Sequence, residues 1–145
     1  MHWLKITEAG IYLVPHNSKE FTNAEELAKW LIEDLAGSEK GVYDVASVYY
    51  WRKIISGSVC LFHKDKLIVG EGRLVDRLLP YSGGETSPET GIRYAGEIHF
   101  DPTSIRVFGK HLSFAAAEKL LGKRLTWRSI QKLTSGDYDL IQKAV

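Results

Sequence analysis

The chain has 145 residues, of which 44% are hydrophobic and 26% are charged, and its formal net charge is +1. That length suits one domain with its own core, so residues 1–145 are expected to form a single unit, and the composition excludes a disordered chain. The single cysteine, Cys60, excludes an internal disulfide and any site with several cysteine ligands. Its apolar surroundings indicate a buried thiol, which is consistent with a cytoplasmic protein. Neither a signal-peptide pattern nor an apolar stretch of about 18 residues is present, so no membrane partner is expected.

The charge is distributed unevenly along the chain. Residues 1–50 hold four Lys or Arg and eight Asp or Glu, a net charge of −4. Residues 105–145 hold eight Lys or Arg and three Asp or Glu, a net charge of +5. This asymmetry indicates either a face that accepts an anion or an ordinary solvated basic surface.

The N-terminal part predicts two short strands followed by a helix. The strands are expected at Trp3–Thr7 and Ile11–Val14. Thr22 and Asn23 are each followed three residues later by a glutamate, which is a capping-box pattern for a helix that ends at Gly37. Apolar residues recur through this segment at helical spacing and indicate core packing.

The middle of the chain predicts a central hairpin between two loops. Tyr43 is expected in a glycine-containing loop, ahead of a short helical piece at Ser47–Ile54. The apolar runs Val59–His63 and Leu67–Leu74 predict paired strands, with His63-Lys64-Asp65 as a solvated hairpin tip. The glycine- and proline-rich stretch Pro80–Gly91 predicts a long loop, and loops of this length often carry function.

The last third predicts short strands alternating with helices: strands at Ile92–Phe100 and Ile105–Phe108, a helix at Ser113–Leu121, a strand region at Leu125–Leu133 and a helix at Thr134–Lys143. Because the strands are short and mostly consecutive, the pattern favours an α+β fold with a mixed or barrel-like sheet over a doubly wound parallel one.

Motifs for catalysis or cofactor binding are missing from the sequence. Neither GxGxxG nor GxxxxGK[ST] follows a strand, and there is no GxSxG elbow. The five histidines do not show metal-site spacing. We therefore predict a protein that is not an enzyme and that needs neither a cofactor nor a metal.

The sixteen aromatic residues are the stronger functional signal. Aromatic rings hold planar bases by stacking, with about 1–3 kcal/mol per base. Tyr49, Tyr50 and Trp51 are consecutive, so they cannot all point inward. Nearby cations would supply phosphate contacts. The candidate residues for the nucleic-acid backbone are Arg52, Lys53, Arg73, Arg77, Lys123, Arg124 and Arg128.

The order of segments resembles the PUA-like superfamily, and within it the EVE and YTH groups. The resemblance rests on the turn Ile55–Ser58, the strands Val59–His63 and Leu67–Leu74, and the closing segment Ile130–Ile141. It covers residues 38–142. Ser58 departs from the pattern, because the family usually has an acidic residue after the turn glycine. The resemblance implies a mixed β-barrel with flanking short helices.

The resemblance also implies a pocket for one base. In YTH domains a cage tryptophan follows a "KGV" sequence, and here Lys40-Gly41-Val42 is followed by Tyr43. A second cage ring comes from the loop after the central hairpin, where this chain offers Tyr81, with Tyr94 at the far end of the loop. The base pocket that we predict in this way consists of Tyr43, Asp44, Ser47, Tyr49, Trp51, Tyr81 and Tyr94, with Asp44 or Ser47 bonding the base edge.

Family members bind RNA or modified DNA, so the resemblance implies two functional alternatives, and a third from a different class stays open. The first is a reader that flips a methylated base, such as N6-methyladenine or 5-methylcytosine, out of duplex DNA. Such readers occur as specificity modules of McrBC-type restriction systems, where they are fused to an NTPase. The second is an RNA-binding domain. The third is a small-molecule or protein-interaction module, or an ASCH-like enzyme.

Overall fold

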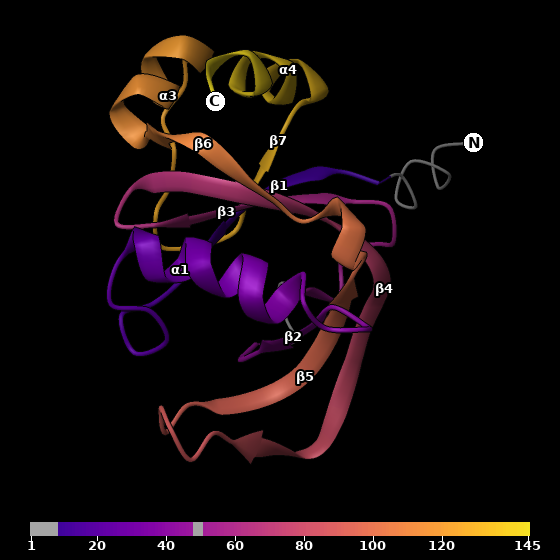
Figure 1. The fold of residues 1–145 in the computed structure, drawn as a ribbon. Helices are drawn as coiled ribbons and strands as arrows, with labels where there is room; N and C mark the ends of the chain where they lie inside the picture. The colour runs from indigo at the N-terminus through magenta and orange to yellow at the C-terminus, as the bar shows by residue number, and fades with distance from the viewer. Residues whose placement is uncertain (1–8, 48–50) are drawn as a thin grey trace, which may run out of the picture.

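The computed structural model describes residues 9–47 and 51–145, which form a small α+β domain with a seven-stranded, mostly antiparallel sheet (Figure 1). The strands follow one another in space as β2-β5-β4-β3-β1-β7, and β6 pairs with β4 beside this path. Among the pairs of this sheet, β1 and β3 run parallel. The strands are β1 (Ile11–Pro15), β2 (Val42–Val45), β3 (Val59–Lys64), β4 (Leu67–Thr86), β5 (Arg93–Phe100), β6 (Arg106–Ser113) and β7 (Gln131–Leu133). The helices are α1 (Ala24–Trp30), the π-helix η2 (Leu31–Leu35), the 3-10 helix η3 (Pro102–Ser104), α3 (Phe114–Leu121) and α4 (Ser135–Ala144).

The central strands bury both faces, because successive side chains of a strand point to opposite sides. Val14, Phe62 and Val69 pack into one core with α1 and η2. Their neighbours Leu13, Leu61 and Ile68 pack into a second core with α3 and α4. Figure 1 shows the corresponding arrangement, with α1 on one side of the sheet and α3 and α4 together near β6 and β7. The sheet is therefore the shared layer between two apolar cores. None of the helices in the described part of the chain is long and apolar enough to span a bilayer.

The helix ends follow the sequence signals. The side chain of Asn23 accepts a hydrogen bond from the Glu26 amide and caps α1. Ser113 caps α3 in the same way, and Gly122 ends it in the left-handed conformation. Thr134 and Asp137 form a reciprocal capping box at α4. The predicted helices are confirmed in these three segments, while the predicted strand Trp3–Thr7 lies outside the described residues.

A buried carboxylate fastens α4 to the sheet. Glu71 of β4 accepts hydrogen bonds from the Tyr138 hydroxyl at 2.5 Å and from the Gln142 amide at 3.0 Å. Arg106 of β6 adds a third bond at 2.9 Å. These bonds offset the desolvation of the carboxylate, so a charged group is tolerated beside the second core.

Three sequence expectations are wrong in the middle of the chain. Pro80–Gly91 is not a long loop, because β4 continues to Thr86 and pairs with β5 across several register shifts. Tyr43 does not lie in a loop, because β2 pairs with β5 and places Tyr43 opposite Ile98. The hairpin turn falls at Asp65 and Lys66, both with positive φ, rather than at Lys64.

Gly41 gives a direct test of the β2 position. Its φ is +59°, and a Cβ atom there would collide with the backbone carbonyl oxygen of Phe100. We expect Gly41→Ala to lower the free energy of unfolding by about 3 kcal/mol, through left-handed strain and displacement of β2. The control is Gly83→Ala, where φ is +76° and no atom lies within 4 Å, so the strain alone costs about 1 kcal/mol. Urea unfolding followed by tryptophan fluorescence measures both, and equal losses would contradict the packing argument.

Candidate functional site

A cavity of about 790 Å³ opens where the carboxyl ends of β1 and β3 meet β2 and the segment before β7. Its size lies within the range of about 300–1,000 Å³ that is typical of ligand sites. Tyr43, Trp51, Tyr94 and Trp127 supply aromatic surface, and His16 and His63 lie at the strand ends. The cavity therefore joins segments that are far apart in the sequence.

A chain of hydrogen bonds fixes the inner wall of the cavity. Parallel pairing aligns Pro15 with His63, so His16 follows directly beside the end of β3. The Nδ1 atom of His16 lies 3.1 Å from the backbone carbonyl oxygen of His63, and its Nε2 atom lies 2.7 Å from the Tyr43 hydroxyl. Because a carbonyl oxygen only accepts, Nδ1 carries the hydrogen, and Nε2 accepts from the Tyr43 hydroxyl.

This inner wall is uncharged at neutral pH. Burial lowers the pKa of His16 to about 4, and the charge of Lys64 acts in the same direction. Burial also raises the pKa of Tyr43 well above its usual value. The neutral imidazole and the neutral phenol therefore present a polar surface that carries no charge.

His63 is a second buried imidazole beside the cavity. It is 2% exposed, and its ring packs edge-on against Phe114 at 4.7 Å between centroids. Burial lowers its pKa to about 3, and the proximity of His16 contributes. Its Nε2 atom has no hydrogen-bond partner within the described ranges. Such an unsatisfied buried group costs about 1–3 kcal/mol.

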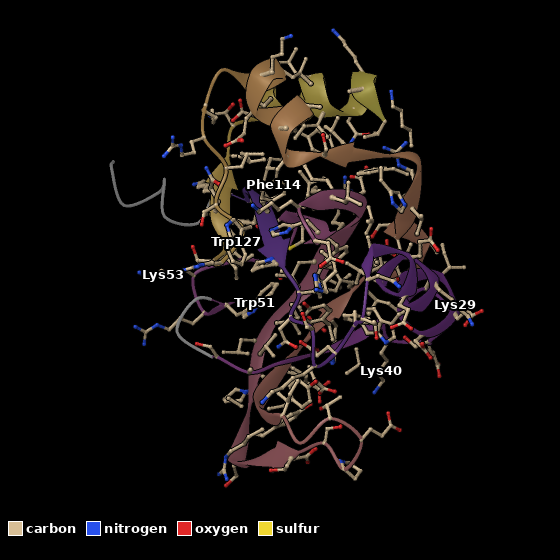
Figure 2. The ribbon with its side chains drawn as sticks, turned by 90° about the vertical axis from the view of Figure 1, so that its left-hand side faces the viewer. Lys29, Lys40, Trp51, Lys53, Phe114 and Trp127 are labelled. Atoms are coloured by element: carbon tan, nitrogen blue, oxygen red, sulfur yellow. The ribbon has the colours of Figure 1, made fainter. Side chains whose placement is uncertain are left out.

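Trp127 stands at the mouth of the cavity between two cations. Its side chain is 47% exposed. The Lys66 ammonium lies 5.4 Å from the ring centroid, and the Arg128 guanidinium lies 4.6 Å from it. Figure 2 shows Trp127, Trp51 and Lys53 on one side of the molecule, away from Lys29 and Lys40. An exposed ring can stack a planar group where a cation moves off its face, and the cation can then meet the negative charge of that group.

Two carboxylates, those of Glu20 and Asp44, also line the cavity. Glu20 accepts a hydrogen bond from the Tyr94 hydroxyl at 3.1 Å, and Asp44 accepts one from the Tyr81 hydroxyl at 2.5 Å. Burial raises the pKa of Glu20, and the negative charge of Asp44 adds to the effect. Among the described residues, no group of three or more His, Cys, Asp or Glu side chains could hold a metal ion.

A second, smaller cavity of about 450 Å³ adjoins the first. The two share four lining residues, Glu20, Tyr43, Asp44 and Tyr94. The wall that carries the carboxylates is therefore common to both cavities.

The structure brings together most of the predicted base-pocket residues. Tyr43, Asp44, Ser47, Trp51 and Tyr94 all line the larger cavity. Tyr43 and Trp51 are also part of the first core, with exposures of 8% and 6%. They therefore form the inner surface of the cavity and are not free-standing cage walls.

Of the other two predicted pocket residues, the structure describes only Tyr81. Tyr81 is not among the residues that line the cavity, because its ring belongs to β4 and its hydroxyl bonds to Asp44 and Glu97. A cage formed by Tyr43 and Tyr81 is therefore not what this structure displays. Tyr49 lies outside the described residues.

The predicted backbone-binding residues are scattered. Arg128 lines the cavity. Lys123 forms an ion pair with Asp137 at 2.6 Å, which belongs to the cap of α4. The exposed residues of this set are Arg52, Lys53, Arg73, Arg124 and Arg128. Arg77 lies in β4, and its side chain is outside the described part of the structure.

The predicted pocket did not include His16, Glu20, Lys66 and Trp127, which line the cavity. Sequence reasoning also assigned His63-Lys64-Asp65 to a solvated tip, whereas His63 and Lys64 are buried beside the cavity. The available signal was that polar residues directly follow two apolar strands. If these strands are parallel neighbours, their carboxyl ends lie together and ligand groups collect there.

The two buried histidines predict a loss of stability in acid. In the unfolded chain both titrate near pH 6.5, whereas in the folded chain burial lowers their pKa values to about 4 and about 3. The unfolded state therefore binds more protons below pH 6.5, and stability falls as pH decreases from 6.5 to 4. We expect His63→Leu to reduce the slope of unfolding free energy against pH by about 1.4 kcal/mol per unit between pH 6 and pH 4.5. Urea titrations at several pH values measure this, and parallel slopes would contradict it.

Comparisons with known proteins identify the fold alone. No family model matches the chain, and no curated protein matches it. The solved structure of Rpa0253 from Rhodopseudomonas palustris is similar, with a TM-score of 0.60, 14% identity and coverage of 93% of this chain and 92% of that one. A hypothetical protein from Leishmania major is similar as well, with a TM-score of 0.61, 16% identity and coverage of 94% of each chain. Atu2648 from Agrobacterium tumefaciens has a TM-score of 0.56 and 14% identity, with coverage of 93% of this chain and 92% of that one. The chain therefore shares its α+β fold with these three proteins over nearly their whole length.

Proposed function

We propose that this chain is a non-catalytic nucleic-acid-binding domain that holds one base in the cavity of about 790 Å³. The observation that carries the proposal is the combination of aromatic interior and cationic mouth. Trp51 and Tyr43 form the interior, and Trp127 stands at the mouth between Lys66 and Arg128. A nucleotide has the same two parts, a planar ring and an anionic phosphate.

The size of the cavity supports a single base with its sugar. A cavity of this volume can enclose a small planar ligand, and stacking on an aromatic ring contributes about 1–3 kcal/mol per base. Arg128 and Lys66 are exposed, so they can reach a phosphate without losing a buried partner. Contacts of this kind position the strand, whereas the interior of the cavity reads the base.

The favoured substrate is duplex DNA with a methylated base that is flipped into the cavity. The family resemblance of residues 38–142 supports this choice, and it implies a PUA-like, EVE- or YTH-like mixed barrel for the sheet. In that reading the chain is a cytoplasmic specificity module of a McrBC-type restriction system, and its partner or parent protein supplies an NTPase. RNA with an unpaired base is the competing ligand, and binding measurements separate the two.

The test is a titration at fixed moderate salt with four probes. Three are 20-base-pair DNA duplexes that carry N6-methyladenine, 5-methylcytosine or no modification, and the fourth is a matched single-stranded RNA. We expect the tightest binding to one modified duplex. We expect Trp127→Ala to weaken that binding about 10- to 100-fold, because it removes a stacking surface. Arg128→Gln should reduce the slope of log affinity against log salt by about one, because one phosphate contact is lost.

Matched controls come from lysines away from the cavity. Lys29 and Lys40 are exposed and lie on the side of the molecule opposite Trp127 (Figure 2). Lys29→Gln and Lys40→Gln should leave both affinity and salt slope unchanged. If the three duplexes bind with equal affinity and the RNA binds more tightly, the ligand is RNA and not modified DNA. Absence of binding to all four probes would refute it.

A further inference from the structure

The wall shared by the two cavities is rich in hydrogen-bond acceptors and poor in donors. Glu20 and Asp44 each use one carboxylate oxygen to accept from a tyrosine hydroxyl. For Glu20 Oε1 and Asp44 Oδ2, no hydrogen bond is found among residues 9–47 and 51–145. Neither carboxylate forms an ion pair in that part of the chain. Two acceptor oxygens are therefore available on this wall.

The hydrogen-bond chain at the inner wall has the same polarity. The carbonyl oxygen of His63 fixes the hydrogen on His16 Nδ1, so the Tyr43 hydroxyl must give its own hydrogen to Nε2. The Tyr43 oxygen then has only lone pairs left for another partner. The tautomer of His16 thus makes Tyr43 an acceptor toward any ligand that reaches it.

The tyrosines also hold the two carboxylates in place. Tyr94 and Tyr81 donate to Glu20 and Asp44, so their hydroxyl hydrogens are not available to a ligand. The two carboxylates are close enough to repel each other, which contributes to the raised pKa of Glu20. An N–H group placed against them would relieve this repulsion and bond the unused oxygens.

We infer that the cavity selects bases that carry an exocyclic amino group and rejects bases with a carbonyl group at the same position. An amino group donates to Glu20 or Asp44, whereas a carbonyl oxygen would face a carboxylate with no hydrogen between them. Discrimination of this kind is strong, because the unfavourable ligand leaves acceptors unpaired. The inference rests on the proposed function and adds the chemical class of the base. The exocyclic amino group of N6-methyladenine keeps one N–H, and that of 5-methylcytosine keeps both. Either modified base can therefore donate to these carboxylates.

The experiment compares bases that differ by this exchange and by the hydrogen that the adjacent ring nitrogen gains in the carbonyl form. Each probe is a 20-base-pair DNA duplex with one central base opposite an abasic site, so that the base is unpaired in every probe. The central base is cytosine or uracil in one pair and adenine or hypoxanthine in the other. We expect the amino base to bind about tenfold more tightly in each pair, as for other hydrogen-bonded base contacts.

Conservative variants test the residues. Glu20→Gln and Asp44→Asn keep the size of the side chain and replace an acceptor oxygen by an NH₂ donor, so each should reduce the ratio to about threefold or less. Glu25→Gln is the matched control, because Glu25 is exposed on α1 and does not line either cavity. Glu25→Gln should keep the tenfold preference for the amino base over the carbonyl base. Thermal unfolding of each variant confirms that it is folded.

The outcomes separate the inference from the proposed function. Equal affinity of the wild type for both members of each pair would overturn the inference and leave base binding intact. An unchanged ratio in Glu20→Gln and Asp44→Asn would overturn the assignment to these carboxylates. If no probe binds, in these duplexes or in the four-probe titration, the proposed function and the inference fail together.

Discussion

The parallel pairing of β1 with β3 is the constraint on which the cavity depends. It brings two carboxyl ends together and places His16 against the backbone carbonyl of His63, 47 residues further along the chain. That one contact decides the tautomer of His16, and the tautomer decides which way the Tyr43 hydroxyl points its hydrogen. The pairing itself is held by apolar side chains on both faces of the two strands, which pack into separate cores. The polarity of the inner wall is thus a consequence of how the sheet is buried.

Charge is separated across the cavity. Lys66 and Arg128 lie at Trp127, and the carboxylates of Glu20 and Asp44 lie on the wall toward the second cavity. Between them the inner wall is neutral, because burial keeps both the imidazole of His16 and the phenol of Tyr43 uncharged. A ligand that fits this arrangement is anionic at one end and rich in N–H groups at the other. The net charge of +1 conceals this separation, although the opposite charges of the first and last thirds of the chain reflect it in part.

Local signals in the sequence predicted the elements whose ends are closed by nearby residues. Asn23, Ser113 and Thr134 cap their helices through contacts three residues away, and such short-range patterns are readable. The extension of β4 to Thr86 was not readable, because it depends on pairing with β5 across shifts in register. The four-residue strand that holds Tyr43 was too short to show its alternation beside Gly41. Tyr81 was assigned to the pocket because its segment resembled a loop, and the strand turns its hydroxyl toward Asp44 and Glu97.

The cavity residues divide by how much of the fold they support, and this division determines which variants are informative. Tyr43 contacts the rings of Phe62, Phe100 and Trp51 and bonds His16, so its removal disturbs the core as well as the cavity. Loss of binding in a Tyr43 variant would therefore not separate a binding role from a structural one. Trp127 is about half exposed and outside both cores, and its ring contacts are with the cations of Lys66 and Arg128. A change at Trp127 alters the ligand surface without removing a member of either core, so the strongest functional argument rests on a residue outside both cores.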